Sequence, residues 1–305
     1  MNLTKKVKDL ALSNDMDYVG IAPVERFENA PQGHKPTDLL PGAESVVSMG
    51  IRLSVGVELS QRIAWSNRKL RHACFSYRWF GYGLLNRYFL DRAAFLLTRL
   101  LEGEGHVAVP IVASGASDTR NLIADFSNRH AAVAAGIGEF GWNGLCLTPD
   151  VGPRARYVSV ITTAKLDPDP MYAGPKLCDP DKCKELGGGQ PLCVKVCPVS
   201  ALSGGSQRVI LGKKSFQVAK DDRNRCMWGS EGLSDGSLAL KPIPMPDKLE
   251  LIDVVNALGE RDPIQNRELW TIGKGDYCGK CIMVCPVGSP EIVDEIASKG
   301  KSKKL

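Results

Sequence analysis

The sequence predicts an α+β protein in two parts, a mixed domain of helices and strands over residues 1–168 and a cysteine-rich module over residues 169–305. Three observations lead to this division. Runs with helical and with strand periodicity alternate through the first part. A stretch rich in proline and aspartate, LDPDPMYAGPKLCDPDKC, marks the junction. Eight of the ten cysteines lie beyond residue 168. A chain of 305 residues that is 43% hydrophobic can bury the core that such a fold needs.

The elements are predicted from hydrophobic spacing. Apolar residues three and four apart predict a helix over Leu3–Leu12, and a broad apolar face predicts a longer helix over Leu84–Leu101. Four runs rich in β-branched residues predict strands: DYVGIAPV, SVVSMGIRLSV, HVAVPIVA and RYVSVITTA. In the second part, one helix is expected over Asp247–Leu258, inside a cysteine-free insert at about 236–273.

Charge and composition limit the partners and the compartment. A formal net charge of +5 permits phosphate-bearing ligands but is too small to argue for them. The N-terminus has neither an apolar signal region nor a twin arginine, and no run approaches the roughly 18 apolar residues of a membrane span. We therefore expect a cytoplasmic protein that does not enter a membrane. In a reducing compartment, clustered cysteines indicate metal or redox chemistry rather than disulfides.

Two endings of the form Cys-x-x-x-Cys-Pro carry the strongest signal, in LCVKVCPVSAL and DYCGKCIMVCPVGSP. In the bacterial ferredoxin pattern, the cysteine before the proline ligates the other of two clusters. Two [4Fe–4S] clusters need eight thiolates, and the module supplies eight. The cross-over predicts one cluster on Cys178, Cys183, Cys193 and Cys285, and the other on Cys226, Cys278, Cys281 and Cys197. A pair of structural zinc sites is the less favoured alternative, because zinc ribbons rarely carry the paired Cys-Pro ending.

The two remaining cysteines and a glycine-rich segment lie outside this pattern. Cys74 and Cys146 have apolar neighbours and are predicted to be buried, inert thiols. The segment GIGEFG matches the G-x-G-x-x-G pattern of dinucleotide sites. It follows an alanine-rich, helix-like run instead of a strand, so a Rossmann site is disfavoured.

The glycine-rich segment and the two Cys-Pro motifs together resemble the epoxyqueuosine reductase and reductive dehalogenase superfamily. The resemblance covers about residues 70–290, through HAAVAAGIGEFGWNGLCLTPDVGPRARYVSVITTAKLDPDP and through DRNRCMWG around Cys226. It implies a nitroreductase-like domain that binds a corrinoid (cobalamin), followed by a bacterial ferredoxin-like module with two [4Fe–4S] clusters. The implied corrinoid site comprises Arg129, His130, Gly136, Gly138, Glu139, Gly141, Asn143, Thr148, Arg154 and Arg156. For the last two arginines, a solvated strand edge is the alternative.

The resemblance also suggests proton donors. Epoxyqueuosine reductases use an aspartate in an Asp-Ser-Gly-Pro-like segment, which is missing here, although Asp118 and Asp125 flank its expected place. Reductive dehalogenases use a tyrosine, for which Tyr77 or Tyr82 stands. We take Asp125 and Tyr82 as the catalytic candidates. The chain fits neither branch fully, because it lacks both the helical-repeat extension of many tRNA-acting members and the export signal of respiratory dehalogenases.

Two functions follow from these observations. The first is a cytoplasmic oxidoreductase that passes low-potential electrons through two clusters to a cobalamin, which reduces a small organic substrate or a modified nucleoside. Its electron donor would be a reduced ferredoxin or flavodoxin, and tRNA is a less favoured partner. The alternative is an electron-transfer or cofactor-handling iron–sulfur protein that reduces no substrate itself.

Overall fold

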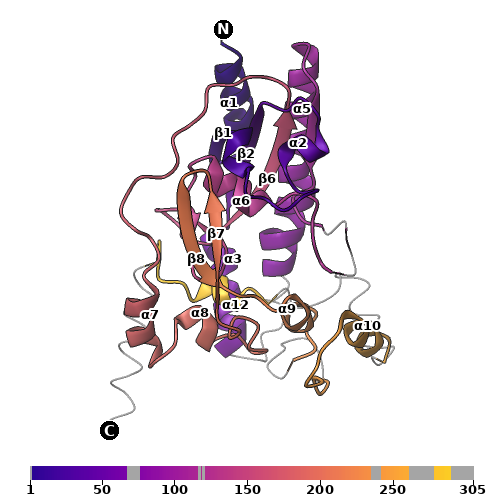
Figure 1. Ribbon diagram of the computed structural model, residues 1–305. Coiled ribbons are helices and arrows are strands. Elements are labelled where there is room, and N and C mark those ends of the chain that lie inside the picture. The colour runs from indigo at the N-terminus through magenta and orange to yellow at the C-terminus, as the bar shows by residue number, and fades with distance from the viewer. Residues whose placement is uncertain are drawn as a thin grey trace.

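The computed structural model describes residues 2–66, 76–115, 118, 121–234, 242–260 and 278–289. A four-stranded sheet stands at its centre, in the order β1-β2-β6-β3, and each neighbouring pair is antiparallel (Figure 1). Its strands are β1 (Tyr18–Pro23), β2 (Ser45–Arg52), β3 (Ala108–Ile111) and β6 (Ala155–Thr162). All four predicted strands are confirmed, and so is the mixture of helices and strands.

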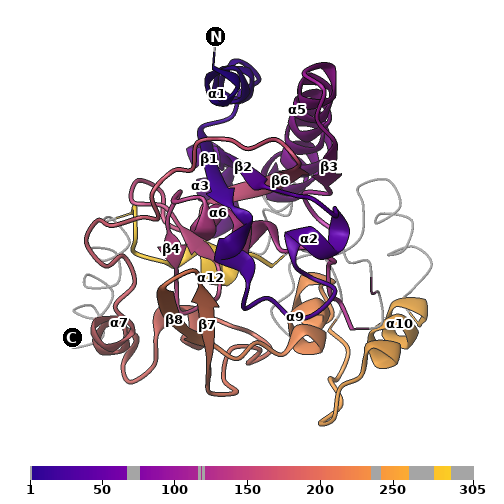
Figure 2. The ribbon, with the colours of Figure 1, turned by 45° about the horizontal axis from the view of Figure 1, so that its top comes forward.

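The two faces of the sheet bury different helices (Figure 2). Helices α1 (Leu3–Ser13) and α5 (Asp91–Gly103) pack on one face, and α6 (Asn128–Ala134) packs on the other. The alternation of side chains along a strand explains this division. On β2, Val47 belongs to the core with α1 and α5, whereas its neighbour Val46 belongs to the core with α6.

The predicted helix over Leu84–Leu101 forms, but with a different beginning. Two π-helical segments, η2 (Tyr77–Gly83) and η3 (Leu85–Leu90), lead into the regular helix α5. Hydrophobic spacing does not separate these segments from an α-helix over so few turns. Widened turns of this kind are frequent at functional sites. The first part also contains η1 (Val24–Phe27), α2 (Pro36–Leu39) and α3 (Val55–Ser66).

The cysteine-bearing helices gather at the end of the molecule away from the N-terminus (Figure 1). These are α7 (Pro180–Gly187), α8 (Leu192–Lys195), α9 (Arg223–Ser230) and α12 (Lys280–Met283). Helix α10 (Leu251–Gly259) confirms the helix predicted in the insert. Cys74 and parts of the insert lie outside the described residues.

A hairpin that the sequence reading did not predict joins the two parts. Its strands are β7 (Ser206–Leu211) and β8 (Lys214–Ala219). Leu211 and Val218 contribute to the core around α6, so the hairpin covers that side of the sheet. Most other hairpin residues are exposed or half-buried, which leaves little hydrophobic signal. The smaller pair β4 (Glu139–Phe140) and β5 (Cys146–Leu147) lies nearby.

The last cysteine-rich segment enters the core of the first part. Ile282 and Met283 of α12 belong to the same buried cluster as Val7 of α1 and Leu97 of α5. The C-terminal cysteines are therefore built directly onto the sheet and its helices. In the described ranges, every helix is too short or too polar to cross a lipid bilayer.

Candidate functional site

Four of the eight module cysteines influence one another electrostatically. The pKa of the Cys193 thiol is raised to about 12, first by burial and then by the thiols of Cys183, Cys285 and Cys178. Burial likewise raises the pKa of Cys285 to about 12, with Arg154 opposing the rise and Cys178 and Cys183 adding to it. These four thiols are therefore neighbours. They are the set that the cross-over rule predicts for one cluster.

The other four cysteines form a second group of neighbours. Burial raises the pKa of Cys226 to about 11, and Cys197 adds to the rise. Burial raises the pKa of Cys278 to about 12, with smaller contributions from Cys226 and Cys197. The pKa of Cys281 is raised well above its ordinary value, first by burial and then by the thiols of Cys278, Cys226 and Cys197. Cys193 of the first group raises it as well. The two groups are therefore adjacent. Their role as cluster ligands stays a prediction.

The spacing of these thiols bears on the choice between cluster and zinc. Among the described residues, no group of three or more His, Cys, Asp or Glu side chains gathers closely enough to hold a single metal ion. Four ligands of a zinc ion converge on one point at about 2.3 Å from each sulfur. In a cubane each thiolate binds a different iron, so the sulfurs stand farther apart. Which of the two these cysteines hold stays a prediction.

Backbone amides donate hydrogen bonds to several of the sulfurs. The N–H of Trp142 donates to Cys178 Sγ at 3.2 Å, that of Leu192 to Cys183 Sγ at 3.3 Å, and that of Ala201 to Cys197 Sγ at 3.2 Å. Such donors favour the charged thiolate, and hydrogen bonds to sulfur tune the reduction potential of a bound cluster. The donor set therefore suits anionic sulfur ligands.

The glycine-rich loop touches both cysteine groups. Glu139 Oε1 accepts hydrogen bonds from the amides of Leu177 at 2.5 Å and Cys178 at 3.3 Å. Four residues further on, the side-chain amide of Asn143 donates to the carbonyl oxygen of Cys281 at 3.4 Å. The loop thus links the first group of thiols to the second. No sequence signal pointed to these contacts, because they join residues far apart in the chain.

A cavity of about 810 Å³ opens beside this loop. Four residues of the predicted corrinoid site line it: Arg129, His130, Asn143 and Arg156. Burial and the charge of Arg129 lower the pKa of His130 to about 4, so its imidazole is neutral at neutral pH. Its ring nitrogen Nδ1 lies 2.7 Å from Ser127 Oγ. Arg129 donates to the carbonyl oxygen of Gly144 at 2.8 Å, which holds the loop against the cavity.

The structure places the other predicted corrinoid residues away from the cavity lining. Gly136 and Gly138 allow the chain to pack against the carbonyl oxygens of Pro170 and Leu147. Gly141 is packed against the Asn143 and Leu147 side chains, and Glu139 holds the Cys178 segment. Arg154 is buried and takes neither predicted position, since its guanidinium pairs with Glu58 at 2.6 Å instead of reaching the cavity or a solvated edge.

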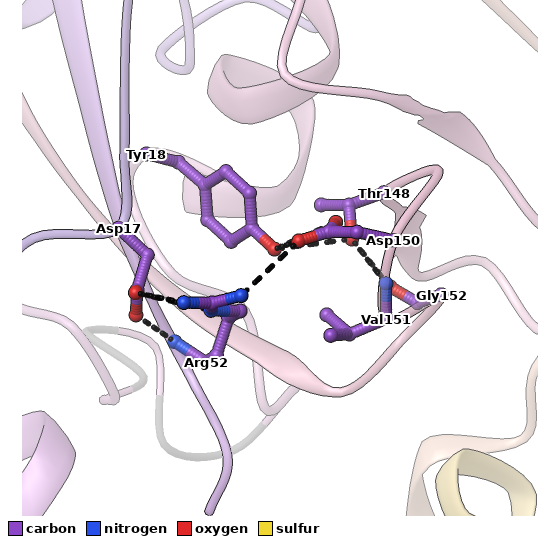
Figure 3. A network of polar contacts seen from close by, with 7 residues as sticks. All are labelled: Asp17, Tyr18, Arg52, Thr148, Asp150, Val151 and Gly152. Atoms are coloured by element: carbon purple, nitrogen blue, oxygen red, sulfur yellow. Dashed lines mark hydrogen bonds and ion pairs between the residues drawn. The ribbon is translucent and has the colours of Figure 1, made fainter. Parts of the chain in front are cut away.

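Thr148, the remaining predicted residue, belongs to a polar network that ties a turn to the sheet (Figure 3). Its Oγ1 accepts from the Val151 amide at 3.3 Å. Next to it, the Tyr18 hydroxyl donates to Asp150 at 2.6 Å, and burial followed by this bond raises the pKa of Tyr18. Arg52 lies between Asp150 at 3.6 Å and Asp17 at 2.9 Å (Figure 3). The network fixes the turn that precedes Arg154.

The catalytic candidates lie at the cavity's edge. The Tyr82 hydroxyl shares a hydrogen bond with Ser114 Oγ, and Ser114 lines the cavity. The Arg156 guanidinium lies 4.9 Å from the centre of the Tyr82 ring. Asp125 is exposed, and its backbone carbonyl oxygen lies 2.8 Å from His34 Nδ1.

Tyr77 and Asp118, the other two possible proton donors, have different partners. The Tyr77 hydroxyl is buried and accepts from Arg156 Nη2 at 2.7 Å. Asp118 accepts from the Asn121 side chain at 2.7 Å. Tyr77 is therefore connected to the cavity wall through Arg156, and Tyr82 through both Ser114 and Arg156.

Polar groups that the sequence reading did not single out also line the cavity. Within the described residues, the buried Asn86 Nδ2 and Asn128 Oδ1 have no hydrogen-bond partner, and both residues line the cavity. A buried polar atom without a partner is costly, so these atoms indicate a place for a polar ligand. Cys146, another lining residue, is buried as predicted, and burial raises its pKa to about 12.

Comparison with known proteins gives matches to two kinds of reductase. No protein-family model matches the chain. Over 113 residues, 33% of the chain, it is 34% identical to the tetrachloroethene reductive dehalogenase of Dehalobacter restrictus. The match spans about a fifth of that relative, 19% of its length.

Two solved structures are similar over most of this chain. One is an epoxyqueuosine reductase with a tRNA-Tyr stem loop, at a TM-score of 0.48 and 17% identity over 94% of this chain and 65% of that one. The other is a reductive dehalogenase whose structure suggests a mechanism for B12-dependent dehalogenation, at a TM-score of 0.47 and 16% identity over 98% of this chain and 36% of that one. The sequence match confirms the resemblance of this chain to the epoxyqueuosine reductase and reductive dehalogenase superfamily, on its reductive dehalogenase side.

Proposed function

We propose that this chain is an oxidoreductase that uses two [4Fe–4S] clusters and a corrinoid to reduce a small organic substrate or a modified nucleoside. One observation carries the proposal: the loop over 139–144 contacts both groups of thiols and also lines the cavity. Electrons that reach either group then have a short protein path to a ligand in the cavity. The reductive dehalogenase match supports the reaction class.

The residues present fit the proposed cofactors. Cys178, Cys183, Cys193 and Cys285 would hold one cluster, and Cys226, Cys278, Cys281 and Cys197 the other. A volume of about 810 Å³ lies near the upper end of the usual range for small-molecule sites, and the unpartnered Asn86 Nδ2 and Asn128 Oδ1 suit a large polar ligand. Arg129, His130, Asn143 and Arg156 would contact a corrinoid there. A bound corrinoid supplies a strongly reducing metal centre.

The chain's own side chains would orient the substrate and move the proton. We assign proton donation to the Tyr82 hydroxyl, which Ser114 holds by a hydrogen bond and which Arg156 approaches from the ring face. His130 stays neutral and would act as a hydrogen-bonding group, not as a charge. A reduced ferredoxin or flavodoxin in the cytoplasm would supply the electrons. tRNA remains the less favoured partner.

The alternative is an electron-transfer or cofactor-handling protein without substrate reduction of its own. One observation favours it: neither Tyr82 nor Asp125 is among the residues that line the cavity. The two functions differ in what a Tyr82→Phe variant does. A reductase loses turnover while both clusters remain, whereas an electron carrier is unaffected.

Anaerobic reconstitution tests the proposal. We expect about eight iron and eight sulfide ions per chain, as two [4Fe–4S] clusters require. We also expect added cobalamin to bind with a changed visible spectrum. Cys226→Ala and Cys193→Ala should each leave about half of the iron, because they belong to different groups. Zinc in place of iron, or an unchanged corrinoid spectrum at saturating protein, would overturn the proposal.

A further inference from the structure

Arg154 is a buried cation that the proposed chemistry has not yet used. It directly precedes β6 and its side chain is 3% exposed. Its Nε donates to Oε1 of Glu58, on α3, at 2.6 Å, and the Glu58 side chain is 10% exposed. A buried ion pair of this kind contributes little net stability by itself, because desolvation offsets the attraction. Its position near the cysteines therefore needs another explanation.

The rest of the guanidinium holds the chain around Cys285. Nη1 donates to the carbonyl oxygens of Val151 at 3.2 Å and Val287 at 2.9 Å. Nη2 donates to the carbonyl oxygens of Met283 at 3.3 Å and Cys285 at 2.5 Å. An arginine has five N–H donors in a rigid fork, and with Glu58 all five are used. Three of the five go to the segment that carries Cys285.

Two glycines bring that segment close enough for the contacts to form. Gly152 has φ +59°, and a Cβ there would overlap the carbonyl oxygen of Val287. Gly288 has φ +69°, and a Cβ there would lie 2.5 Å from Val151 Cα. The turn that precedes Arg154 and the segment that follows Cys285 therefore touch backbone to backbone. Arg154 lies at this contact, and the network of Figure 3 holds the same turn through the hydrogen bond of the Val151 amide to Thr148.

We propose that Arg154 positions Cys285 and that its charge, partly balanced by Glu58, sets the reduction potential of the cluster on Cys178, Cys183, Cys193 and Cys285. The inference rests on the proposed function. Reduction adds one electron to [4Fe–4S]²⁺ and gives [4Fe–4S]⁺, with the electron supplied by a low-potential donor and no proton taken up. A buried cation near the cluster stabilises the more negative state, because screening is weak in the interior. A buried carboxylate destabilises it.

Replacing each partner of the ion pair gives opposite shifts. We would titrate the reconstituted protein with an anaerobic reductant and follow the EPR signal of the reduced cluster. Arg154→Met should make reduction at least about tenfold less favourable, a fall of about 59 mV for one electron. Glu58→Gln should raise the potential. Arg154→Lys keeps the positive charge but loses the planar set of five donors, so the reduction potential of the cluster should stay near that of the unmodified protein. Lys5→Gln, which removes an exposed cation on α1, is the control and should change little.

A second measurement separates this inference from the proposed function. In the apoprotein, Arg154→Lys loses the five-donor geometry but keeps the charge that lowers the Cys285 pKa, so it should speed alkylation of Cys285 severalfold, with Cys183 as the internal reference. A purely stabilising ion pair would shift the potential in the same direction in Arg154→Met and Glu58→Gln, or in neither, and that result overturns the inference. Failure of the unmodified protein to assemble clusters would overturn the proposed function. The alkylation ratio would then judge the positioning of Cys285 alone.

Discussion

The two cysteine-rich segments are organised in different ways, although both end in Cys-Pro. In the segment over 178–197, backbone amides donate to the sulfurs of Cys178 and Cys183. In the segment over 278–289, side chains from elsewhere donate to backbone carbonyl oxygens: Gln61 to Cys278, Asn143 to Cys281 and Arg154 to Cys285. Backbone amides also donate to sulfurs in the second segment, that of Lys280 to Cys278 and that of Val287 to Cys285. What distinguishes the second segment is that side chains from the rest of the fold hold its carbonyl oxygens.

Local sequence explains much of the first segment. Asp179 caps α7 by accepting from the amides of Asp181 and Lys182, and Gly188 ends the helix in a left-handed conformation. These are short-range signals for a helix start and stop. Segment 278–289 instead depends on tertiary contacts, including the burial of Ile282 and Met283 in the core beside the sheet. The segment over 178–197 can therefore tolerate local changes that the segment over 278–289 cannot.

Alanine at matched glycines gives the largest expected contrast. Gly188 and Gly288 have nearly the same φ, +67° and +69°. Next to a Cβ at Gly188 lies only the flexible end of Lys195, at 3.7 Å, so Gly188→Ala should cost about 1–2 kcal/mol of left-handed strain. Gly288→Ala adds overlap with the Val151 backbone and should cost about 2–5 kcal/mol. Urea unfolding of the two apoproteins measures both values, and equal costs would contradict the backbone contact.

Replacing Glu139 should have an intermediate effect, on how firmly the segment over 178–197 holds its cluster. Glu139→Gln replaces a charged acceptor by a neutral one for the amides of Leu177 and Cys178, a loss of about 1 kcal/mol for each bond. Iron release to a chelator should become severalfold faster from the cluster on Cys178, with the other cluster unaffected. The exposed Glu44→Gln is the control. Equal release from both clusters would show that Glu139 does not serve one segment specifically.

Thiol reactivity gives the smallest contrast and includes a pH dependence. Burial raises the pKa of Cys183 and raises that of Cys281 well above the ordinary thiol value. In the apoprotein, alkylation of Cys281 should therefore keep accelerating at pH values where Cys183 levels off, as mass spectrometry can follow. When the pKa of a thiol is higher in the folded than in the unfolded state, its contribution to stability is fully present below the unfolded pKa. That contribution is lost as the pH rises from the unfolded pKa through the folded pKa. The free energy of unfolding of the apoprotein should fall in alkaline solution, and a flat profile would contradict this.

Sequence patterns predicted the elements that are marked by runs or spacings of apolar residues, and missed the contacts that depend on distant polar groups. All four strands of the sheet and the helix over Leu3–Leu12 were predicted, because the strands are rich in β-branched residues and buried almost throughout in β2, and α1 has apolar residues at helical spacing. The hairpin β7–β8 was missed, since few of its side chains are buried. The resemblance predicted that Arg154 contacts a corrinoid. Its real partners lie on α3 and around Cys285, and no local pattern links those places.

The burial of Ile282 and Met283 beside Val7 has a consequence for biosynthesis. A ribosome makes α1 well before residues 278–289. While the chain is growing, the sheet and its helices lack the side chains that complete this core, and the carbonyl acceptors of Arg154 are missing too. Domains otherwise tend to fold in the order of their synthesis. Here the nascent chain has to keep an unfinished core until residues 278–289 emerge, so the core and the contacts of Arg154 are completed together and late.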